Sequence, residues 1–288
     1  AGGTITLTRS LVNGNATPGV GGGAAAEGGI TVTNSTVSTN AASTGGGLYA
    51  GGPVNLQYAT IAGNDAATTA NIRTIGIQNT SLPLVRPQAI VPAAAPLTSF
   101  GSVVALPFGG GENCTTGPQT SSGYNYENGG ASCGFTQTGD TSNGADPLLG
   151  ALADNTGPTQ THLPGAGSPL VNKIPAGSSC TGPDQRLIPR PQMNACDIGA
   201  VEVRTPAAGD GFLTTTINTP VNGDIRNYVT DPDGWLNGGT WTAQPATNGS
   251  LATLGDGGGF TYTPDRGFVG TDSFPYVVCD SLKSYCTP

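Results

Sequence analysis

The sequence ITLTRSLVNGN at residues 5–15 returns as ITVTNSTVSTN at 30–40 and as VNLQYATIAGN at 54–64. The three copies align without gaps, at steps of 25 and 24 residues. A fainter copy begins at 75–77, and a degenerate copy runs from 97 to 104. A repeat of this length indicates a solenoid, because one such unit cannot bury its apolar face alone and needs stacked neighbours.

Each copy has the pattern of two short strands joined by a bend. Aliphatic residues alternate with polar ones in the first strand, which is typical of a strand with one buried face. Each copy ends in asparagine, which tolerates a left-handed corner and can stack as an amide ladder. Glycines recur at 21–23 and 45–47, where tight corners or close stacking require them. The predicted inward residues are Ile5, Leu7, Val12, Ile30, Val32, Val37, Val54, Leu56 and Ile61, and the ladder residues are Asn15, Asn40 and Asn64.

Residues 3–105 resemble the right-handed β-helix repeats of bacterial surface proteins, which share the aliphatic-Thr strand closed by Asn and followed by Gly-rich turns. The resemblance implies a right-handed parallel β-helix, and we place its coils at residues 1–112. A leucine-rich or helical repeat would need a leucine spacing and helix formers that this stretch lacks. We therefore predict an all-β chain that begins with a solenoid.

In residues 113–204 the repeat pattern ends, and glycine, proline and aspartate occur at frequent intervals. The motifs DPLLG at 146–150, LADNTGPTQTH at 152–162 and CDIGA at 196–200 resemble the segment that closes such β-helices, the choice-of-anchor type. We predict that its ionisable residues form a buried network that closes the end of the solenoid and neutralises its own charges. No nucleophile accompanies the histidine, so we predict no catalytic residue. The residues are His162, Asp184, Arg186, Arg190 and Asp197, with the acidic residue Glu202 beside them.

Residues 205–288 carry short alternating runs between turn signals, which favours a β-sandwich. The motifs TDPDG at 230–234, FTYTP at 260–264 and GTDSF at 270–274 resemble cadherin-like or immunoglobulin-like repeats of bacterial surface proteins. Asp231 and Asp233 are candidate calcium ligands, since hard cations take oxygen donors. The alternative is that both aspartates cap a tight turn.

Six cysteines fall in three local couples, Cys114 with Cys133, Cys180 with Cys196, and Cys279 with Cys286. Six cysteines allow 15 pairings, and the nearest-neighbour scheme is our preference among them. A zinc site would need closer cysteine spacing and nearby histidine. Disulfides indicate an exported protein in an oxidising environment.

Compared with the repeats that it resembles, the C-terminal sandwich is expected to lack its last strand. Exposed strand edges are templates for pairing, so we expect a strand from a neighbouring subunit to complete the module and produce a head-to-tail homopolymer. The alternative is a truncated chain. The predicted assembly edges are Thr4, Ile5, Thr6 and Leu7 at one end and Phe274, Tyr276 and Val278 at the other.

Composition restricts the possible functions. The net charge is −8, and clustered lysine and arginine are absent from the sequence, so a nucleic acid is not expected as a partner. No apolar run is long enough for a transmembrane segment. We predict an extracellular structural protein of the cell surface without a required cofactor, not an enzyme. One alternative is an adhesin that binds surface glycans, and a second is a polysaccharide lyase or hydrolase. The aromatic residues that could stack on sugars are Tyr49, Tyr58, Tyr124, Tyr126, Trp235 and Trp241.

Overall fold

The computed structural model describes residues 3–76, 93–177, 179–192, 194–234, 239–253, 257–279 and 286–287. The chain divides into two compact units, Ala1–Val203 and Arg204–Pro288. The described residues are all-β, as predicted, apart from the short 3-10 helix η1 (Ile225–Tyr228). No helix in these residues is long and apolar enough to span a membrane.

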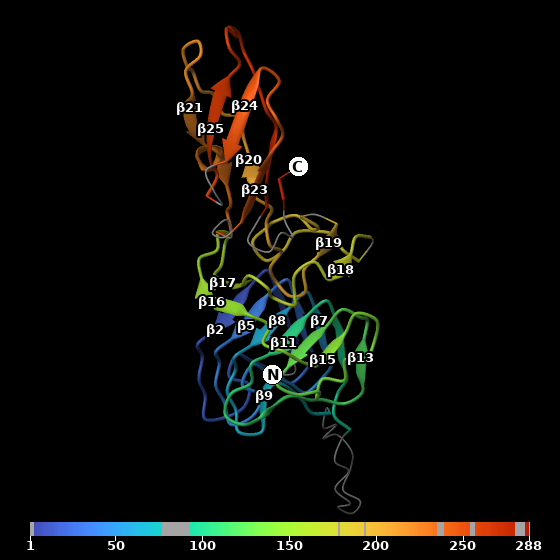
Figure 1. Cartoon of the computed structure of the whole chain (residues 1–288). Coiled ribbons are helices and arrows are strands. Elements are labelled where there is room, and N and C mark those ends of the chain that lie inside the picture. The colour runs from blue at the N-terminus through green and yellow to red at the C-terminus, as the bar shows by residue number, and fades with distance from the viewer. Residues whose placement is uncertain are drawn as a thin grey trace, which may run out of the picture. The chain divides into compact units, whose positions relative to one another are not determined.

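The first unit is built around three parallel sheets, to which successive stretches of chain add one strand each (Figure 1). The first sheet contains β1 (Ile5–Thr8), β4 (Ile30–Thr33), β7 (Val54–Gln57), β10 (Leu97–Phe100) and β13 (Gln119–Ser121). The second contains β2 (Leu11–Asn13), β5 (Thr36–Ser38), β8 (Thr60–Ala62), β11 (Val103–Ala105), β14 (Tyr126–Asn128) and β15 (Thr141–Gly144). The third contains β3 (Ala24–Ala26), β6 (Leu48–Ala50), β9 (Thr69–Thr74) and β12 (Glu112–Thr115). We call each successive set of strands a rung.

The register of the first sheet follows the sequence repeat. Ile5 pairs with Ile30, and Ile30 pairs with Val54. Leu97 then pairs with Val54, so the degenerate copy, and not the fainter copy that begins at Ile75, forms the fourth rung. The fainter copy extends beyond residue 76 and lies mostly outside the described residues. These parallel sheets are compatible with the predicted β-helix.

The parallel sheets continue beyond residue 112, the last residue of the predicted coils. Strands β12 to β15 extend them to Gly144. The sequence has no aliphatic alternation here, because Gln119 pairs with Leu97 and Ser121 pairs with Ser99. The chain then forms two antiparallel pairs, β16 (Leu149–Ala153) with β17 (Thr161–Pro164) and β18 (Ile174–Pro175) with β19 (Ala195–Cys196).

The core of the stack is a row of aliphatic side chains from successive rungs, including Ile30, Val37 and Ile61, which are fully buried. Beside it lies the predicted amide ladder, in which each side-chain amide donates to the next oxygen. The ladder bonds are Asn15 Nδ2 to Asn40 Oδ1 (3.0 Å), Asn40 Nδ2 to Asn64 Oδ1 (3.0 Å), Asn64 Nδ2 to Asn71 Oδ1 (2.7 Å), Asn71 Nδ2 to Asn113 Oδ1 (2.7 Å) and Asn113 Nδ2 to Glu127 Oε1 (3.2 Å). The ladder therefore ends on a buried carboxylate, which can only accept.

The repeated glycines allow the corners of neighbouring rungs to approach closely. A Cβ atom on Gly46 would lie 2.4 Å from the carbonyl oxygen of Asp65, and one on Gly22 would lie 2.5 Å from that of Ala41. A side chain at either position would collide with backbone of the next rung, so glycine is needed there.

One end of the stack is capped. Residues 129–135, the cap loop, place Cys133 and Phe135 against the aliphatic core, and Cys133 forms a disulfide with Cys114. At the first rung, by contrast, Ile5, Leu7 and Val12 are only half-buried. The two ends of the stack therefore differ in how far they cover the core.

The second unit contains antiparallel sheets. Strand β25 (Gly259–Pro264) pairs with β21 (Val221–Asp224) and β24 (Gly249–Thr253), and β23 (Thr240–Ala243) pairs with β26 (Tyr276–Cys279). A further short pair joins β20 (Ala207–Ala208) to β22 (Val229–Thr230). Phe260 and Phe274 meet edge to face in the core, with ring centroids 5.1 Å apart.

All six cysteines form disulfides, and the predicted nearest-neighbour pairing is confirmed. The bonds join Cys114 to Cys133, Cys180 to Cys196, and Cys279 to Cys286. Each bond closes a short loop, and two of them hold segments that cover the parallel sheets.

Candidate functional site

Residues 179–203, which we call the covering segment, lie against the outer face of the second sheet. Thr36 Oγ1 donates to Gln185 Oε1 at 2.7 Å, and the backbone N–H of Ala200 donates to Thr60 Oγ1 at 3.0 Å. Outward residues of β5 and β8 are consequently buried. These contacts run across successive rungs on one side of the stack.

The ionisable residues of the covering segment form two buried ion pairs. Arg186 Nε lies 3.2 Å from Asp184 Oδ2, and Arg190 Nη1 lies 2.7 Å from Glu202 Oε2, with all four side chains fully buried. The guanidinium of Arg190 also sits over the Tyr58 ring, 4.2 Å from its centroid. The cluster is the self-neutralising network that the sequence predicted.

Backbone groups occupy the remaining oxygens of this network. Asp184 Oδ1 accepts from the N–H groups of Arg186 (2.7 Å) and Ile188 (2.8 Å). Asp197 accepts from the N–H groups of Asn172 (2.7 Å) and Val203 (2.6 Å). Carboxylates that hold loop backbone in this way are structural supports, and their burial leaves no route for a substrate.

Burial gives Asp197 an unusual affinity for protons. Its complete burial, followed by the nearby charge of Glu202, raises its pKa from 3.8 to about 7. Burial raises the pKa of Glu202 as well, although Arg190 opposes that shift. At neutral pH, the folded protein thus holds protons that the unfolded chain releases.

We expect stability to fall with rising pH between about 4 and 7 through Asp197. Its folded pKa lies above its unfolded value, so in that window the folded state binds more protons than the unfolded state. Urea unfolding of wild type and Asp197→Asn at several pH values measures this dependence. The free-energy difference between the two proteins should shrink as pH rises towards 7, and a pH-independent difference would contradict the assignment.

His162 makes stability rise with pH, which is opposite to the effect of Asp197. This contribution is the same in wild type and in Asp197→Asn. Burial lowers its pKa, and its Nδ1 lies 2.7 Å from the carbonyl oxygen of Gly150. The comparison with Asp197→Asn removes this contribution. As a matched control, Asp210→Asn changes an exposed aspartate and should leave the slope unchanged.

Asp231 and Asp233 do not fit a calcium ion. Both carboxylate oxygens of Asp233 accept from Arg204, at 2.7 Å from its backbone N–H and 2.9 Å from Nη2. Asp231 Oδ1 accepts from the N–H of Asp233 at 2.9 Å. In the described part of the chain, no group of three or more His, Cys, Asp or Glu side chains could hold a metal ion. The alternative prediction, a turn held by aspartates, agrees with these contacts.

The two predicted assembly edges differ. Strand β1 lies at the margin of the first sheet, with Thr6 exposed and Ile5 and Leu7 half-buried, and Thr4 just before it is exposed. Val278 is instead fully buried, pairs with Trp241, and exchanges hydrogen bonds with Thr287. In this structure Val278 is therefore paired and buried within its own unit.

Phe274 and Tyr276, the other two residues of that predicted edge, also serve the second unit. Phe274 packs on Phe260 in the core, and the Tyr276 hydroxyl donates to the carbonyl oxygen of Gly209 at 2.6 Å. Phe274 and Tyr276 are half-buried, like Ile5 and Leu7 of β1, but their contacts lie within the second unit.

Most of the aromatic residues predicted to stack on sugars are buried or half-buried within the protein. Tyr58 and Tyr126 are buried, and burial raises the pKa of Tyr58 to about 12. Tyr49, Tyr124 and Trp241 are half-buried, whereas Trp235 lies outside the described residues. These residues do not form one exposed aromatic platform.

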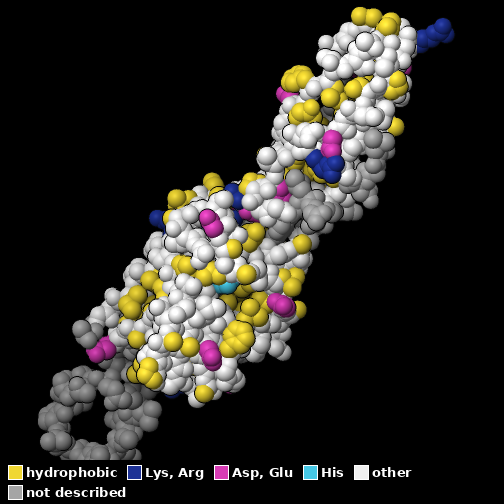
Figure 2. Space-filling model, turned by 90° about the vertical axis from the view of Figure 1, so that its left-hand side faces the viewer, with side chains coloured by type: hydrophobic (Ala, Val, Ile, Leu, Met, Phe, Trp, Pro, Cys, Tyr) yellow, Lys and Arg dark blue, Asp and Glu magenta, His cyan; other side chains and the backbone are white. Residues whose placement is uncertain are grey.

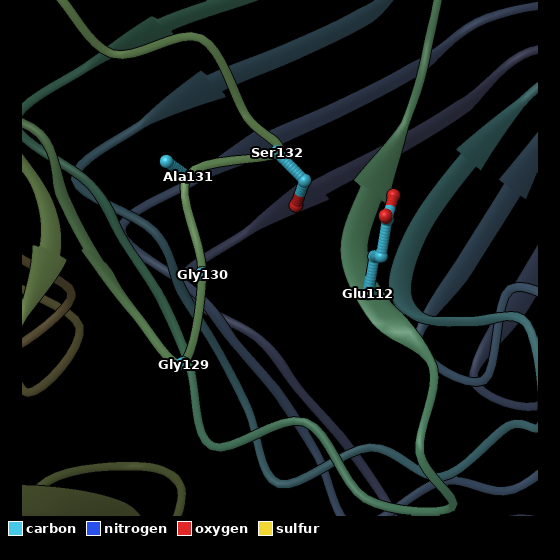
Figure 3. Close-up of a pocket in the computed structure, with 5 residues that line it drawn as sticks. All are labelled: Glu112, Gly129, Gly130, Ala131 and Ser132. Atoms are coloured by element: carbon cyan, nitrogen blue, oxygen red, sulfur yellow. The ribbon is translucent and has the colours of Figure 1, made fainter.

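A pocket of about 390 Å³ lies between Glu112 and the cap-loop residues 129–132 (Figure 3). Ser132 is its only hydroxyl, and Oγ donates to Glu127 Oε1 at 2.9 Å while it accepts from the N–H of Cys114 at 3.0 Å. The hydroxyl therefore fastens the cap loop. The pocket does not combine a free nucleophile with a base.

Comparison with known proteins identifies only the second unit. Residues 204–285 match the family model of the bacterial Ig domain. Such domains are typically non-enzymatic, and together with the three disulfides the match is consistent with an extracellular or surface protein. No curated protein and no solved structure matches the chain. The resemblance of residues 3–105 and of the middle segment to bacterial β-helix proteins stays a prediction.

Sequence reasoning missed two features of these sites. The contact of Arg190 with Tyr58 joins residues 132 positions apart, and no local pattern signals it. The outward side chains of the first sheet have the ordinary pattern of polar residues alternating with aliphatic ones along a strand, which does not signal a groove. In the view of Figure 2, charged side chains are sparse and scattered.

Proposed function

We propose that this protein is an extracellular structural protein, a parallel β-helix carrying an immunoglobulin-like module, whose copies join into a homopolymer. The observation that carries the proposal is the first-rung edge, defined as residues 4–8. Its Ile5 and Leu7 are half-buried, whereas Ile30 and Val32, their partners in the next rung, are fully buried. An added strand would bury the exposed part of these side chains and satisfy the edge backbone.

The hydrogen-bond pattern of β1 supports this proposal. The N–H of Ile5 donates to Gly29 at 3.0 Å, and that of Arg9 donates to Thr33 at 3.1 Å. Because donors alternate along a strand, the N–H groups of Thr6 and Thr8 point away from β4. The edge thus offers both main-chain donors and an apolar surface.

The segment FLTTTI at residues 212–217 in the second unit has the properties of a donor strand. It is rich in β-formers but has no strand partner among the described residues. Its apolar side chains are unusually open, with Phe212 86% exposed and Ile217 53% exposed. We propose that this segment of one copy adds to the first-rung edge of another.

Catalysis is not part of the proposal. The densest group of ionisable side chains is sealed beneath backbone, and the bacterial Ig domain is typically non-enzymatic. A stack held by a buried ladder, buried ion pairs and disulfides suits a load-bearing role.

Thr6→Pro should abolish polymer formation while the subunit stays folded. Proline removes an N–H that faces away from β4, so the ladder between β1 and β4 is retained. Phe212→Asp should have the same effect from the donor side. Sedimentation velocity and negative-stain electron microscopy of the full chain measure assembly, and thermal melting checks the fold.

The control for the donor side is Val269→Asp, which places a charge on another apolar residue of the second unit that is 81% exposed. It should assemble like wild type. Polymers that persist in folded Thr6→Pro, or a wild type that stays monomeric at every concentration, would refute the proposed edge.

A further inference from the structure

We propose that the outer face of the first sheet binds an uncharged polysaccharide. A groove of about 230 Å³ runs across strands β4, β7 and β10 on this face. We call it the first-sheet groove. Its principal side chains are Thr31, Thr33, Asn55, Gln57, Thr98 and Phe100.

Five polar side chains of this groove are not used within the described part of the protein. The side chains of Thr31, Thr33, Asn55, Gln57 and Thr98 make no hydrogen bond to any part of the chain that the structure describes. Asn55 and Gln57 are exposed, and the threonines are half-buried. These hydroxyls and amides can both donate and accept, which is what the hydroxyl groups of a sugar require.

In the second sheet, two outward threonines bond to the covering segment. Thr36 and Thr60, which point out of β5 and β8, bond to Gln185 and Ala200 of the covering segment. The first sheet carries the same kind of side chain in the same rungs, yet its hydrogen-bonding groups remain available. They are open to solvent and to an external ligand.

The lack of charged residues in the first-sheet groove indicates which class of polysaccharide it would bind. None of the residues that line the groove is charged, so it offers no Arg or Lys to pair with carboxylate or sulfate groups. The net charge of −8 further disfavours an acidic polymer. A neutral glycan suits this surface better than an anionic one.

Phe100 supplies an apolar wall to the groove. Its ring lies 5.5 Å from that of Tyr58 and 6.3 Å from that of Tyr124, in edge-to-face geometry with both. These neighbours fix the ring in place, and its half-buried side chain leaves a part against which a sugar ring can pack. Strand spacing of about 4.8 Å repeats the polar groups along the groove, as an extended polymer would need.

Affinity electrophoresis of the full chain in gels containing hydroxyethyl cellulose, dextran or mannan tests the proposal, with polygalacturonate as an acidic comparison. We expect at least one neutral polymer to retard the wild type more than polygalacturonate does. Asn55→Ala/Gln57→Ala should weaken that retardation by about tenfold, because two side chains that bind the sugar are lost.

The matched control is Asn13→Ala/Gln137→Ala, which removes the same two residue types at exposed positions outside the groove. It should bind like wild type, and circular dichroism confirms that both variants are folded. The proposal is overturned if no neutral polymer retards the wild type, if only the acidic polymer does, or if the groove variant binds as tightly as the control. Repeating the gels with Thr6→Pro separates glycan binding from assembly, since that variant should keep the groove.

Discussion

Arg190→Ala should lower the free energy of unfolding of the first unit by about 3–5 kcal/mol, the cost of leaving a buried charge without its partner. The substitution removes the guanidinium that lies 2.7 Å from Glu202 and 4.2 Å from the centre of the Tyr58 ring. Glu202 and Asp197 would then share a buried site without that positive charge. Urea unfolding followed by far-ultraviolet circular dichroism measures the loss.

The control for this prediction is an ion pair on the surface. Arg226 pairs with Asp224 in the second unit, and its side chain is 60% exposed. Arg226→Ala should cost far less stability than Arg190→Ala, because solvent screens exposed pairs. Equal losses for the two variants would contradict the view that the covering segment is held by its buried charges.

Asn64→Ala should destabilise the first unit by more than about 3 kcal/mol, because it interrupts the amide ladder at its centre. The Asn64 side chain accepts from the backbone and side chain of Asn40 and donates to Val37 and Asn71. Its removal leaves these groups unpaired in a fully buried site. Chemical denaturation quantifies the effect.

Asn15 provides the comparison within the same ladder. It is exposed and bonds to one ladder neighbour, Asn40, so Asn15→Ala should cost less than about 1 kcal/mol. If both variants lose similar amounts of stability, the ladder does not contribute through burial.

The sequence predicted the first three rungs well, because Ile5, Ile30 and Val54 begin copies of nearly constant length. At the fourth rung the sequence offered two candidates, the fainter copy at Ile75 and the degenerate copy at 97–104, and the degenerate copy pairs with β7. The sequence carried no signal at the fifth rung. There Cys133 and Phe135 of the cap loop fill core positions that strand residues fill elsewhere.

The candidate sites were less predictable than the fold. The cluster around Asp184 and Arg190 was found from its density in the sequence, but its position against the second sheet depends on contacts such as that of Gln185 with Thr36, 149 residues away. The first-sheet groove gave no signal, since its threonines read as the ordinary polar face of a strand. Only the comparison of two sheets, one covered and one open, distinguishes them.

The direction of the amide ladder also limits how this protein can change in length. Each amide donates toward Glu127, so the order of donors and acceptors survives only if chain is added or removed as a complete rung. Duplicating residues 30–53 would repeat Asn40 and Gly45 to Gly47 together, and should lengthen the stack by about 4.8 Å. The stack can therefore change in length only by whole rungs, and related chains of different size should differ by whole repeats.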